Sequence, residues 1–301
     1  MSSTLQGILA PMTTPFRADG EIDDSAIAQQ VQFLLAQGVH GLVVGGSTGE
    51  GHVLDGDELR RVVGTVVSEV AGRVPVLAGV IADSTRQAIQ RGQAVGDLGV
   101  EALQVTPVHY LFRPDDDAMV EYFRTVADET GLPVIIYNVI RWNYLDPDLL
   151  GRILREVPGV IGIKQSAGDL KLFADLLLSV GPDDLVLSAV DALMYPSFTL
   201  GAHGAVAAIL AAVPGSCVEL WNAVQAGDHA KARDLHGRLL SLWNAIDGDN
   251  LPACVKYAQS RQGCPVTYPR APMPVASERQ KQAIDQALNR IGVEATDSVV
   301  A

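Results

Sequence analysis

Short runs of apolar residues alternate along the chain with longer amphipathic segments. The apolar runs are rich in small and β-branched residues and end in turn residues, as buried strands do, whereas the amphipathic segments place hydrophobic residues three or four positions apart, as helices do. The runs that predict strands are residues 7–16, 41–44, 74–80, 102–107, 133–138, 159–166, 185–190 and 204–209. The segments that predict helices between them are residues 23–37, 57–70, 84–97, 116–130, 146–156, 169–179 and 191–200.

Eight strands, each followed by a connecting segment, predict an α/β fold of the (β/α)8 barrel type. The strands read as continuous apolar runs, which is typical of strands covered by protein on both faces. From about Gly227 the pattern changes to helices alone, predicted over residues 228–245, 251–262 and 277–291. We therefore expect residues 1–226 to form the barrel and residues 227–301 to form a C-terminal helical extension that ends in a frayed tail over 294–301.

Composition and charge narrow the class of protein. The chain has 301 residues, 48% of them hydrophobic, which is enough for a large core. Its net charge is −13 and its Lys and Arg residues are scattered, so we expect neither a nucleic-acid surface nor an anionic-membrane surface. No apolar run approaches the roughly 20 residues that span a bilayer, and the N-terminus lacks the basic and apolar regions of a signal peptide. We therefore expect a cytoplasmic protein.

The cysteines and histidines do not follow the patterns of disulfide or metal sites. Cys217, Cys254 and Cys264 contain no Cys-x-x-Cys pair and are odd in number, which is typical of reduced thiols in a cytosolic protein. The sequence has no His-Glu-x-x-His motif or comparable ligand spacing. We therefore expect no disulfide and no metal.

One charged residue stands at the end of a strand that otherwise reads as buried. Lys164 closes the run over residues 159–166, and Tyr137 closes the run before it. Such a lysine often pairs with an acid or extends to solvent. Burial, however, disfavours the charged form of a lysine and leaves a free amine, which can attack a carbonyl and form a Schiff base. A tyrosine on the neighbouring strand can relay protons, because its hydroxyl both donates and accepts.

A Gly-rich turn follows the second strand, with the sequence Gly46-Ser47-Thr48-Gly49-Glu50. It matches neither the Gly-x-Gly-x-x-Gly nor the Walker pattern, so we reject nucleotide binding. Glycines after a strand also serve tight turns alone. Here the successive backbone N–H groups and the two hydroxyls form a compact set of donors, suited to the carboxylate of a 2-oxo acid.

These motifs resemble the family of dihydrodipicolinate synthase and N-acetylneuraminate lyase. The matching segments are residues 13–16, 46–50, 105–107, 137–138 and 162–165, spread over nearly the whole chain. The resemblance implies a barrel that holds pyruvate as a Schiff base on Lys164, with Tyr137 as the proton shuttle and Ser47 with Thr48 as the carboxylate cradle and relay. It also implies a homotetramer that needs no cofactor.

Two loops differ from the family pattern. Where the synthases have a second tyrosine after Thr-Pro, contributed across a subunit interface, this chain has His109 at the ungapped position and Tyr110 beside it, and either can fill that role. Arg141 falls one place earlier than the family's arginine for the second substrate's carboxylate. Trp142 and Asn143 follow it, and we expect this loop to line the pocket because it overhangs the reactive lysine.

The residues that would select the second substrate also differ. Ser166 lies two positions after the lysine and is expected to contact substrate. After strand seven the lyases have Asp-Glu for sugar hydroxyls, whereas this chain has Asp191 and Ala192. After strand eight the polar residues of the family are replaced by Ala207 and Ala208. A polyhydroxylated sialic acid would therefore lose hydrogen-bond partners.

We expect a Schiff-base lyase that makes or breaks a C–C bond between pyruvate, or another 2-oxo acid, and an aldehyde. Two alternatives use the same imine, namely dehydration of a 2-keto-3-deoxy sugar acid and synthesis of 4-hydroxy-tetrahydrodipicolinate. A non-enzymatic alternative is a barrel that senses a 2-oxo acid without forming a covalent adduct.

Overall fold

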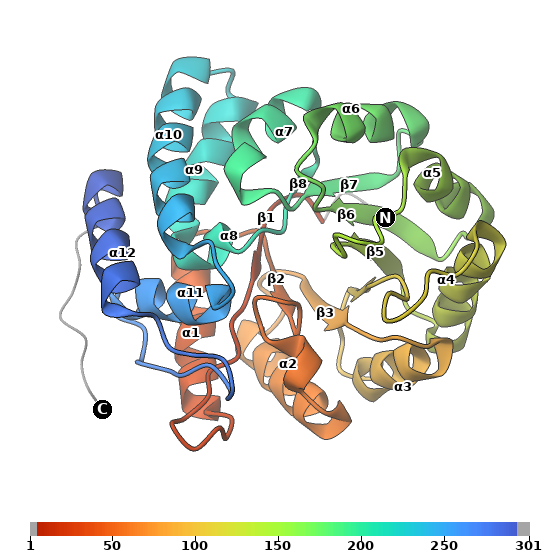
Figure 1. Ribbon diagram of the computed structural model, residues 1–301, viewed down its shortest axis with the longest axis horizontal. Helices are drawn as coiled ribbons and strands as arrows, with labels where there is room; N and C mark the ends of the chain where they lie inside the picture. The colour runs from red at the N-terminus through yellow and green to blue at the C-terminus, as the bar shows by residue number, and fades with distance from the viewer. Residues whose placement is uncertain (1–4, 294–301) are drawn as a thin grey trace.

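Eight parallel strands close into a barrel in the computed structural model, which describes residues 5–293 (Figure 1). The strands follow one another around the ring in chain order, and β8 pairs with β1 to close it. They are β1 (Gly7–Pro11), β2 (Gly41–Val44), β3 (Val76–Val80), β4 (Ala102–Val105), β5 (Val134–Asn138), β6 (Val160–Gln165), β7 (Leu185–Ser188) and β8 (Gly204–Ala205). The predicted fold class is confirmed.

Helices surround the barrel and continue past it. Those between the strands are α1 (Asp24–Ala36), α2 (Gly56–Val70), α3 (Thr85–Val95), α4 (Asp116–Thr130), α5 (Pro147–Glu156), α6 (Leu170–Ser179) and α7 (Met194–Leu200), with short 3₁₀ turns η2 (Gly51–Val53) and η3 (Asp191–Leu193). After β8 come α8 (Ile209–Ala212), α9 (Pro214–Gln225), α10 (His229–Ile246), α11 (Leu251–Ser260) and α12 (Glu278–Ile291).

Acidic and hydroxyl residues fix where many helices begin. The side chain at the N-cap accepts a hydrogen bond from a backbone N–H of the first turn, which satisfies one of the donors that a helix start leaves unpaired. Residues that do so are Asp23, Asp55, Ser84, Asp115, Asp146, Asp169, Asp228 and Ser277. Much of the net negative charge therefore lies where it also favours the helix dipole.

Apolar side chains fill both the inside and the outside of the ring. Leu9, Val43, Leu77, Ala102, Ile135, Leu185, Leu187 and Val206 belong to one buried cluster, which lies inside the barrel. The alternate strand residues pack against the surrounding helices in a larger cluster. This double coverage explains why the strands read as continuous apolar runs.

Two predictions around the last strand are wrong in detail. The strand predicted over residues 204–209 ends at Ala205, and residues from Ile209 belong to α8 instead. The stretch is rich in alanine, the best helix former, and the carboxylate of Asp191 accepts the Ile209 N–H at 2.8 Å where the helix starts. Helix α9, which begins with Pro214 in its first turn, was not among the predicted segments.

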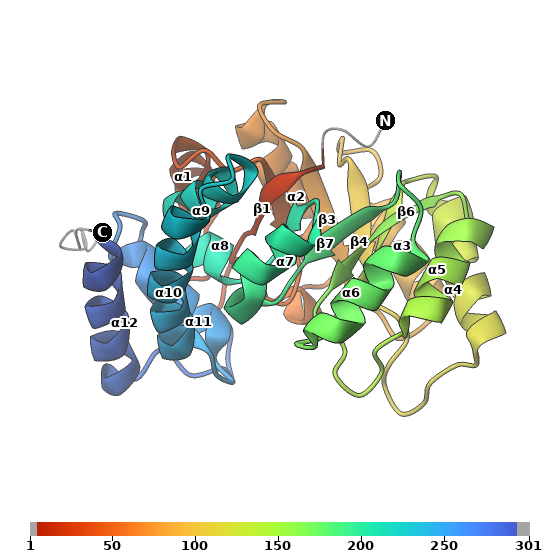
Figure 2. The ribbon, with the colours of Figure 1, turned by 90° about the horizontal axis from the view of Figure 1, so that it is seen from above.

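The C-terminal helices lie along one side of the barrel (Figures 1 and 2). Helix α10 packs against α9 and α12, and α11 packs against α8 and α12. The division at residue 226 stays a prediction, and the predicted frayed tail over 294–301 lies outside the described residues. Cys217, Cys254 and Cys264 are free and buried. Within residues 5–293 no helix has the length and apolar character of a membrane span.

A buried ion pair joins the barrel to these helices. Glu50 follows the Gly-rich turn, and its Oε1 accepts from Nζ of Lys256 on α11 at 2.6 Å. Its Oε2 accepts from the backbone N–H of Arg270 at 2.9 Å, while Lys256 also donates to the Tyr268 carbonyl. Burial lowers the pKa of Lys256 to about 8, although the charge of Glu50 acts in the opposite direction. The turn after β2 is thus anchored from the C-terminal side.

Removing one partner of this pair should destabilise the fold strongly. Lys256→Met leaves the Glu50 carboxylate buried without its cation, so we expect a loss of about 3–5 kcal/mol in the free energy of unfolding, measured with urea. The double variant Glu50→Gln/Lys256→Met removes both charges and should lose less than Lys256→Met alone.

The control is Lys171→Met, which breaks the pair between Lys171 and Asp175 on the surface of α6. That change should cost less than about 1 kcal/mol. Equal costs for Lys256→Met and Lys171→Met would contradict the anchoring role of the buried pair.

Candidate active site

The register of β5 against β6 places Tyr137 directly beside Lys164. The two residues are Cα partners near the carboxyl ends of their strands, where barrel enzymes carry their reactive groups. Both point into the ring because they alternate with residues that face the helices, such as Ile136 and Ile163.

Lys164 is a buried amine without a partner. Its side chain is 5% exposed, and its Nζ lies 3.9 Å from the centroid of the Tyr137 ring. Within residues 5–293 the amine makes no hydrogen bond and no ion pair, which is uncommon for a buried lysine. The hydroxyl of Tyr137 donates to Oγ of Ser47 at 2.9 Å. The three side chains thus form a short row from the strand β6 to the turn after β2.

The Gly-rich turn presents unpaired backbone donors. Gly45 has a left-handed backbone (φ 73°), and a Cβ on Gly49 would lie 2.8 Å from the Met12 carbonyl oxygen, so both positions require glycine. The amides of Ser47 and Thr48 make no hydrogen bond to any other described residue. Such adjacent free N–H groups form a site for an anion.

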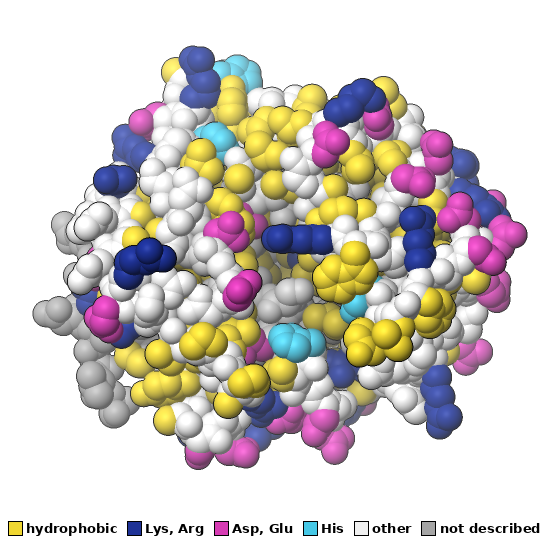
Figure 3. All heavy atoms as spheres, viewed as in Figure 1, with side chains coloured by type: hydrophobic (Ala, Val, Ile, Leu, Met, Phe, Trp, Pro, Cys, Tyr) yellow, Lys and Arg dark blue, Asp and Glu magenta, His cyan; other side chains and the backbone are white. Residues whose placement is uncertain are grey.

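A hollow of about 490 Å³ opens above these groups at the carboxyl ends of the strands. Figure 3 shows this face of the molecule, where a Lys or Arg side chain lies across the centre with acidic, His and hydrophobic side chains around it. The predicted site residues that line the hollow are Ser47, Thr48, Tyr137, Arg141, Lys164, Ser166, Asp191 and Ala207. Gly46 and Gly49 shape the turn that carries the first two of them.

Asp191 places a carboxyl group in the wall of the hollow. Its side chain is buried and accepts the Ile209 N–H. Burial raises the pKa of Asp191 to about 6, while the bond from Ile209 and the positive charge of Lys164 act in the opposite direction. This carboxyl group therefore changes its charge within the pH range of most enzymes, close to the buried amine.

Four predicted residues lie in the neighbouring loops instead of in the wall. Tyr110 is 65% exposed, and the backbone N–H groups of His109 and Tyr110 both donate to Asp83 Oδ1. Trp142 donates from its indole N–H to the His109 carbonyl, and Asn143 donates to the Val108 carbonyl at 2.6 Å. These bonds join the loops after β3, β4 and β5. Catalytic or binding roles for the four residues stay predictions.

The hollow also has walls that the sequence did not reveal. Trp243 near the end of α10 and Leu251 at the start of α11 line it, together with Val139. Ala192 and Ala208, which the sequence places after strands seven and eight, line it as well. The one sign of this wall in the sequence was Trp243, a tryptophan close to the turn between two predicted helices. Helix cores contain many aromatic residues, so such a position does not by itself indicate a binding site.

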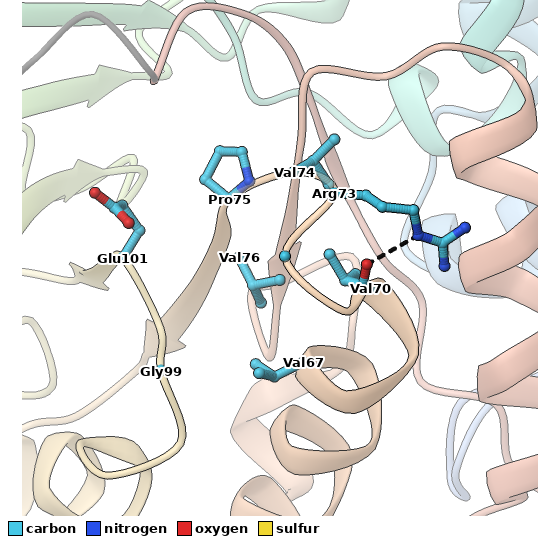
Figure 4. A pocket seen from close by; sticks show the side chains of 9 residues that line it. Val67, Val70, Arg73, Val74, Pro75, Val76, Gly99 and Glu101 are labelled. Atoms are coloured by element: carbon cyan, nitrogen blue, oxygen red, sulfur yellow. Dashed lines mark hydrogen bonds between the residues drawn. The ribbon is translucent and has the colours of Figure 1, made fainter.

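A second hollow, of about 430 Å³, lies between the end of α2 and the start of β3 (Figure 4). Valine side chains line it, and Arg73 in its wall donates to the Val70 carbonyl. Glu101 is the other charged residue that lines it. Among the described residues, no group of three His, Cys, Asp or Glu side chains could hold a metal ion.

Comparison with known proteins identifies the family of the chain. A family model described as the Dihydrodipicolinate synthetase family matches residues 4–291. The chain is 32% identical over 296 residues to the 4-hydroxy-tetrahydrodipicolinate synthase of Methanopyrus kandleri, covering 97% of this chain and 98% of that protein. It is 35% identical over 292 residues to the enzyme of the same name from Pseudomonas aeruginosa, covering 96% and 99%.

Solved structures give the same result. The dihydrodipicolinate synthase of Aquifex aeolicus matches with a TM-score of 0.91 and 26% identity, over 97% of this chain and 100% of that one. YagE of Escherichia coli, a member of the dihydrodipicolinic acid synthase family in complex with pyruvate, matches with a TM-score of 0.91 and 28% identity over the same shares. The chain therefore belongs to the dihydrodipicolinate synthetase family, whose members are lyases that use a lysine Schiff base.

Proposed function

We propose that Lys164 condenses with pyruvate, or a closely related 2-oxo acid, and that the resulting enamine reacts with an aldehyde. The observation that carries this proposal is the buried amine of Lys164, which has no partner within residues 5–293 and lies 3.9 Å from the Tyr137 ring centroid. Pyruvate in the structure of the related YagE protein supports the choice of 2-oxo acid.

The proposed reaction begins with the formation of an imine on Lys164. The amine of Lys164 adds to the ketone carbon, and loss of water gives an iminium ion, which draws electrons from the neighbouring carbon. C3 then loses a proton to form an enamine. C3 of the enamine then attacks the aldehyde carbon. The new C–C bond replaces the π bond of the aldehyde carbonyl, and the aldehyde oxygen takes up a proton. Water hydrolyses the iminium, which releases a 4-hydroxy-2-oxo acid and restores the amine; the reverse sequence is the lyase reaction.

The neighbouring groups have assignable roles in these steps. The free amides and hydroxyls of Ser47 and Thr48 bind the carboxylate of the 2-oxo acid. This places the ketone carbon toward Lys164. Tyr137 moves protons to and from the reacting oxygen, and its hydrogen bond to Ser47 Oγ keeps the phenol oriented.

A second candidate is synthesis of 4-hydroxy-tetrahydrodipicolinate, which the names of the relatives favour. Removing the three carbons of pyruvate from this seven-carbon product leaves a four-carbon amino acid aldehyde, aspartate 4-semialdehyde. Arg141 in the wall of the hollow can pair with the carboxylate of such a partner. Product analysis by mass spectrometry separates this reaction from a simple aldol and from dehydration of a 2-keto-3-deoxy sugar acid.

Assembly into a homotetramer, as expected from the family, is part of the proposal. Tyr110, Leu111, Phe112 and Trp142 are large hydrophobic residues exposed together on the loops beside the hollow, which supports contact with a second copy. In such a contact either His109 or Tyr110 would reach the partner's site. The molar mass in solution, measured by light scattering, tests the assembly. A cytoplasmic location stays a prediction.

Borohydride reduction with pyruvate should modify Lys164 alone. Because only the iminium is reduced to a stable amine, intact mass should rise by one pyruvate-derived group, and peptide mapping should place that group on Lys164. Lys164→Arg should abolish the adduct, whereas Lys171→Arg, on the surface of α6, should not change it. An unmodified Lys164 in the wild-type protein would rule out the proposed chemistry and favour a 2-oxo acid sensor.

Replacing Tyr137 by Phe should slow turnover without unfolding the protein. The variant keeps the ring beside Lys164 but loses the hydroxyl, so we expect kcat to fall by about a hundredfold or more, as loss of general acid–base help does. Tyr195→Phe on α7, whose hydroxyl contacts His229 outside the hollow, is the matched control and should keep normal kcat. If both variants turned over alike, Tyr137 would have no part in proton transfer.

Pyruvate affinity should depend on the charge of Asp191. Above about pH 6 the carboxylate is ionised and attracts the positive iminium, whereas below that pH it is neutral and does not. We therefore expect the apparent Kd for pyruvate, measured by calorimetry, to fall at least about threefold between about pH 5 and about pH 7. Asp191→Asn should lose this dependence, and the surface variant Asp175→Asn should keep it. The same pH profile in the Asp191→Asn protein would exclude Asp191 as its cause.

A further inference from the structure

Part of the hollow is lined by six residues with mainly apolar side chains, of which only Trp243 carries a hydrogen-bond donor. They come from five separate segments: the loops after β5, β7 and β8, and the helices α10 and α11. The residues are Val139, Ala192, Ala207, Ala208, Trp243 and Leu251. The C-terminal helices contribute the two largest of them, so the site for the second substrate is completed from outside the barrel.

Most polar side chains that line the hollow are already engaged, either with the 2-oxo acid in the proposed function or in hydrogen bonds within the protein. Ser47, Thr48 and Tyr137 serve the 2-oxo acid, and one oxygen of Asp191 accepts the Ile209 N–H. The Tyr144 hydroxyl donates to the backbone carbonyl oxygen of Ser166 at 3.2 Å. Few donors and acceptors therefore remain for a second substrate.

Three polar side chains keep unused hydrogen-bonding capacity. The hydroxyl of Ser166 is buried and has no hydrogen-bond partner among the described residues. Asp191 lines the hollow, and only one of its two oxygens accepts the Ile209 N–H. Arg141 also lines the hollow, and its side chain is exposed. A ligand seated against Trp243 and Leu251 would therefore find few polar partners within the wall.

This wall disfavours a polyhydroxylated partner. Each hydroxyl that moves from water to an apolar wall without a new hydrogen bond costs about 1–3 kcal/mol. An apolar body instead gains about 25 cal/mol for each Å² that it removes from water. The indole of Trp243 also offers a flat face for stacking.

We propose that the aldehyde partner has an apolar, flat body that packs against Trp243 and Leu251, with benzaldehyde as the simplest example. The inference rests on the proposed function, because the aldehyde reacts with the enamine on Lys164. The bond that forms joins C3 of the 2-oxo acid to the aldehyde carbon, and the proton lost from C3 is balanced by the proton gained on the new hydroxyl.

The test compares three aldehydes with pyruvate as the fixed partner: benzaldehyde, glyceraldehyde and aspartate 4-semialdehyde. Products are quantified by mass spectrometry, and kcat/KM is measured for each. We expect kcat/KM for benzaldehyde to exceed the other two values by at least about tenfold, a difference of about 1.4 kcal/mol in transition-state binding. Any other order, including equal values, overturns the inference.

Variants locate the apolar contact. Trp243→Ala should lower kcat/KM for benzaldehyde by at least about tenfold and leave the fraction of Lys164 trapped by borohydride with pyruvate unchanged. Leu251→Asn adds an amide to the same wall and should raise the ratio of glyceraldehyde to benzaldehyde activity. Leu178→Ala, an exposed residue on α6 that is 86% exposed, is the control and should change neither quantity.

The outcomes separate this inference from the proposed function. If pyruvate is not trapped on Lys164, the proposed function fails and the inference fails with it. If pyruvate is trapped but glyceraldehyde or aspartate 4-semialdehyde reacts faster than benzaldehyde, only the inference fails. If the Trp243→Ala protein melts at a much lower temperature than the wild type, Leu251→Asn becomes the test of the inference. An unchanged ratio of glyceraldehyde to benzaldehyde activity in that variant contradicts the inference.

Discussion

The pairing of β5 with β6 is the constraint on which the site depends. Parallel pairing in this register sets Tyr137 opposite Lys164, and a shift of either strand by one residue would turn its own side chain toward the helices. The closed ring then buries the amine on all sides except the mouth of the hollow. A buried lysine without a partner is uncommon, and it is the feature on which the proposed Schiff-base chemistry depends.

A second region has to be held against this pair. The turn that bears Ser47 and Thr48 follows β2, on the far side of the ring from β6. Its position depends on glycines that let the backbone approach neighbouring carbonyl groups, and on Glu50, whose two oxygens are bound by Lys256 and the Arg270 amide. In the proposed function, placement of the carboxylate of the 2-oxo acid therefore depends on contacts far apart in the sequence.

Sequence patterns predicted the features that depend on residues close together in the chain, and they missed the features that depend on residues far apart in it. The apolar runs gave the strands because both faces of each strand are buried, and Lys164 was found because its charge interrupts such a run. Trp243 and Leu251 were missed because their place in the wall depends on how α10 and α11 pack across the barrel. The path of Tyr110 away from the hollow depends on Asp83, a residue from another loop.

The anchoring of Glu50 also changes how the C-terminal helices should be regarded. A shortened gene that stopped after β8 and α9 would still encode every strand and the side chains of Lys164, Tyr137 and Ser47. Its product would nevertheless lack both groups that bind the Glu50 carboxylate, at the end of the turn that carries Ser47 and Thr48. The segment through Arg270 is therefore part of what holds this turn in place, and not only a cover on one side of the barrel.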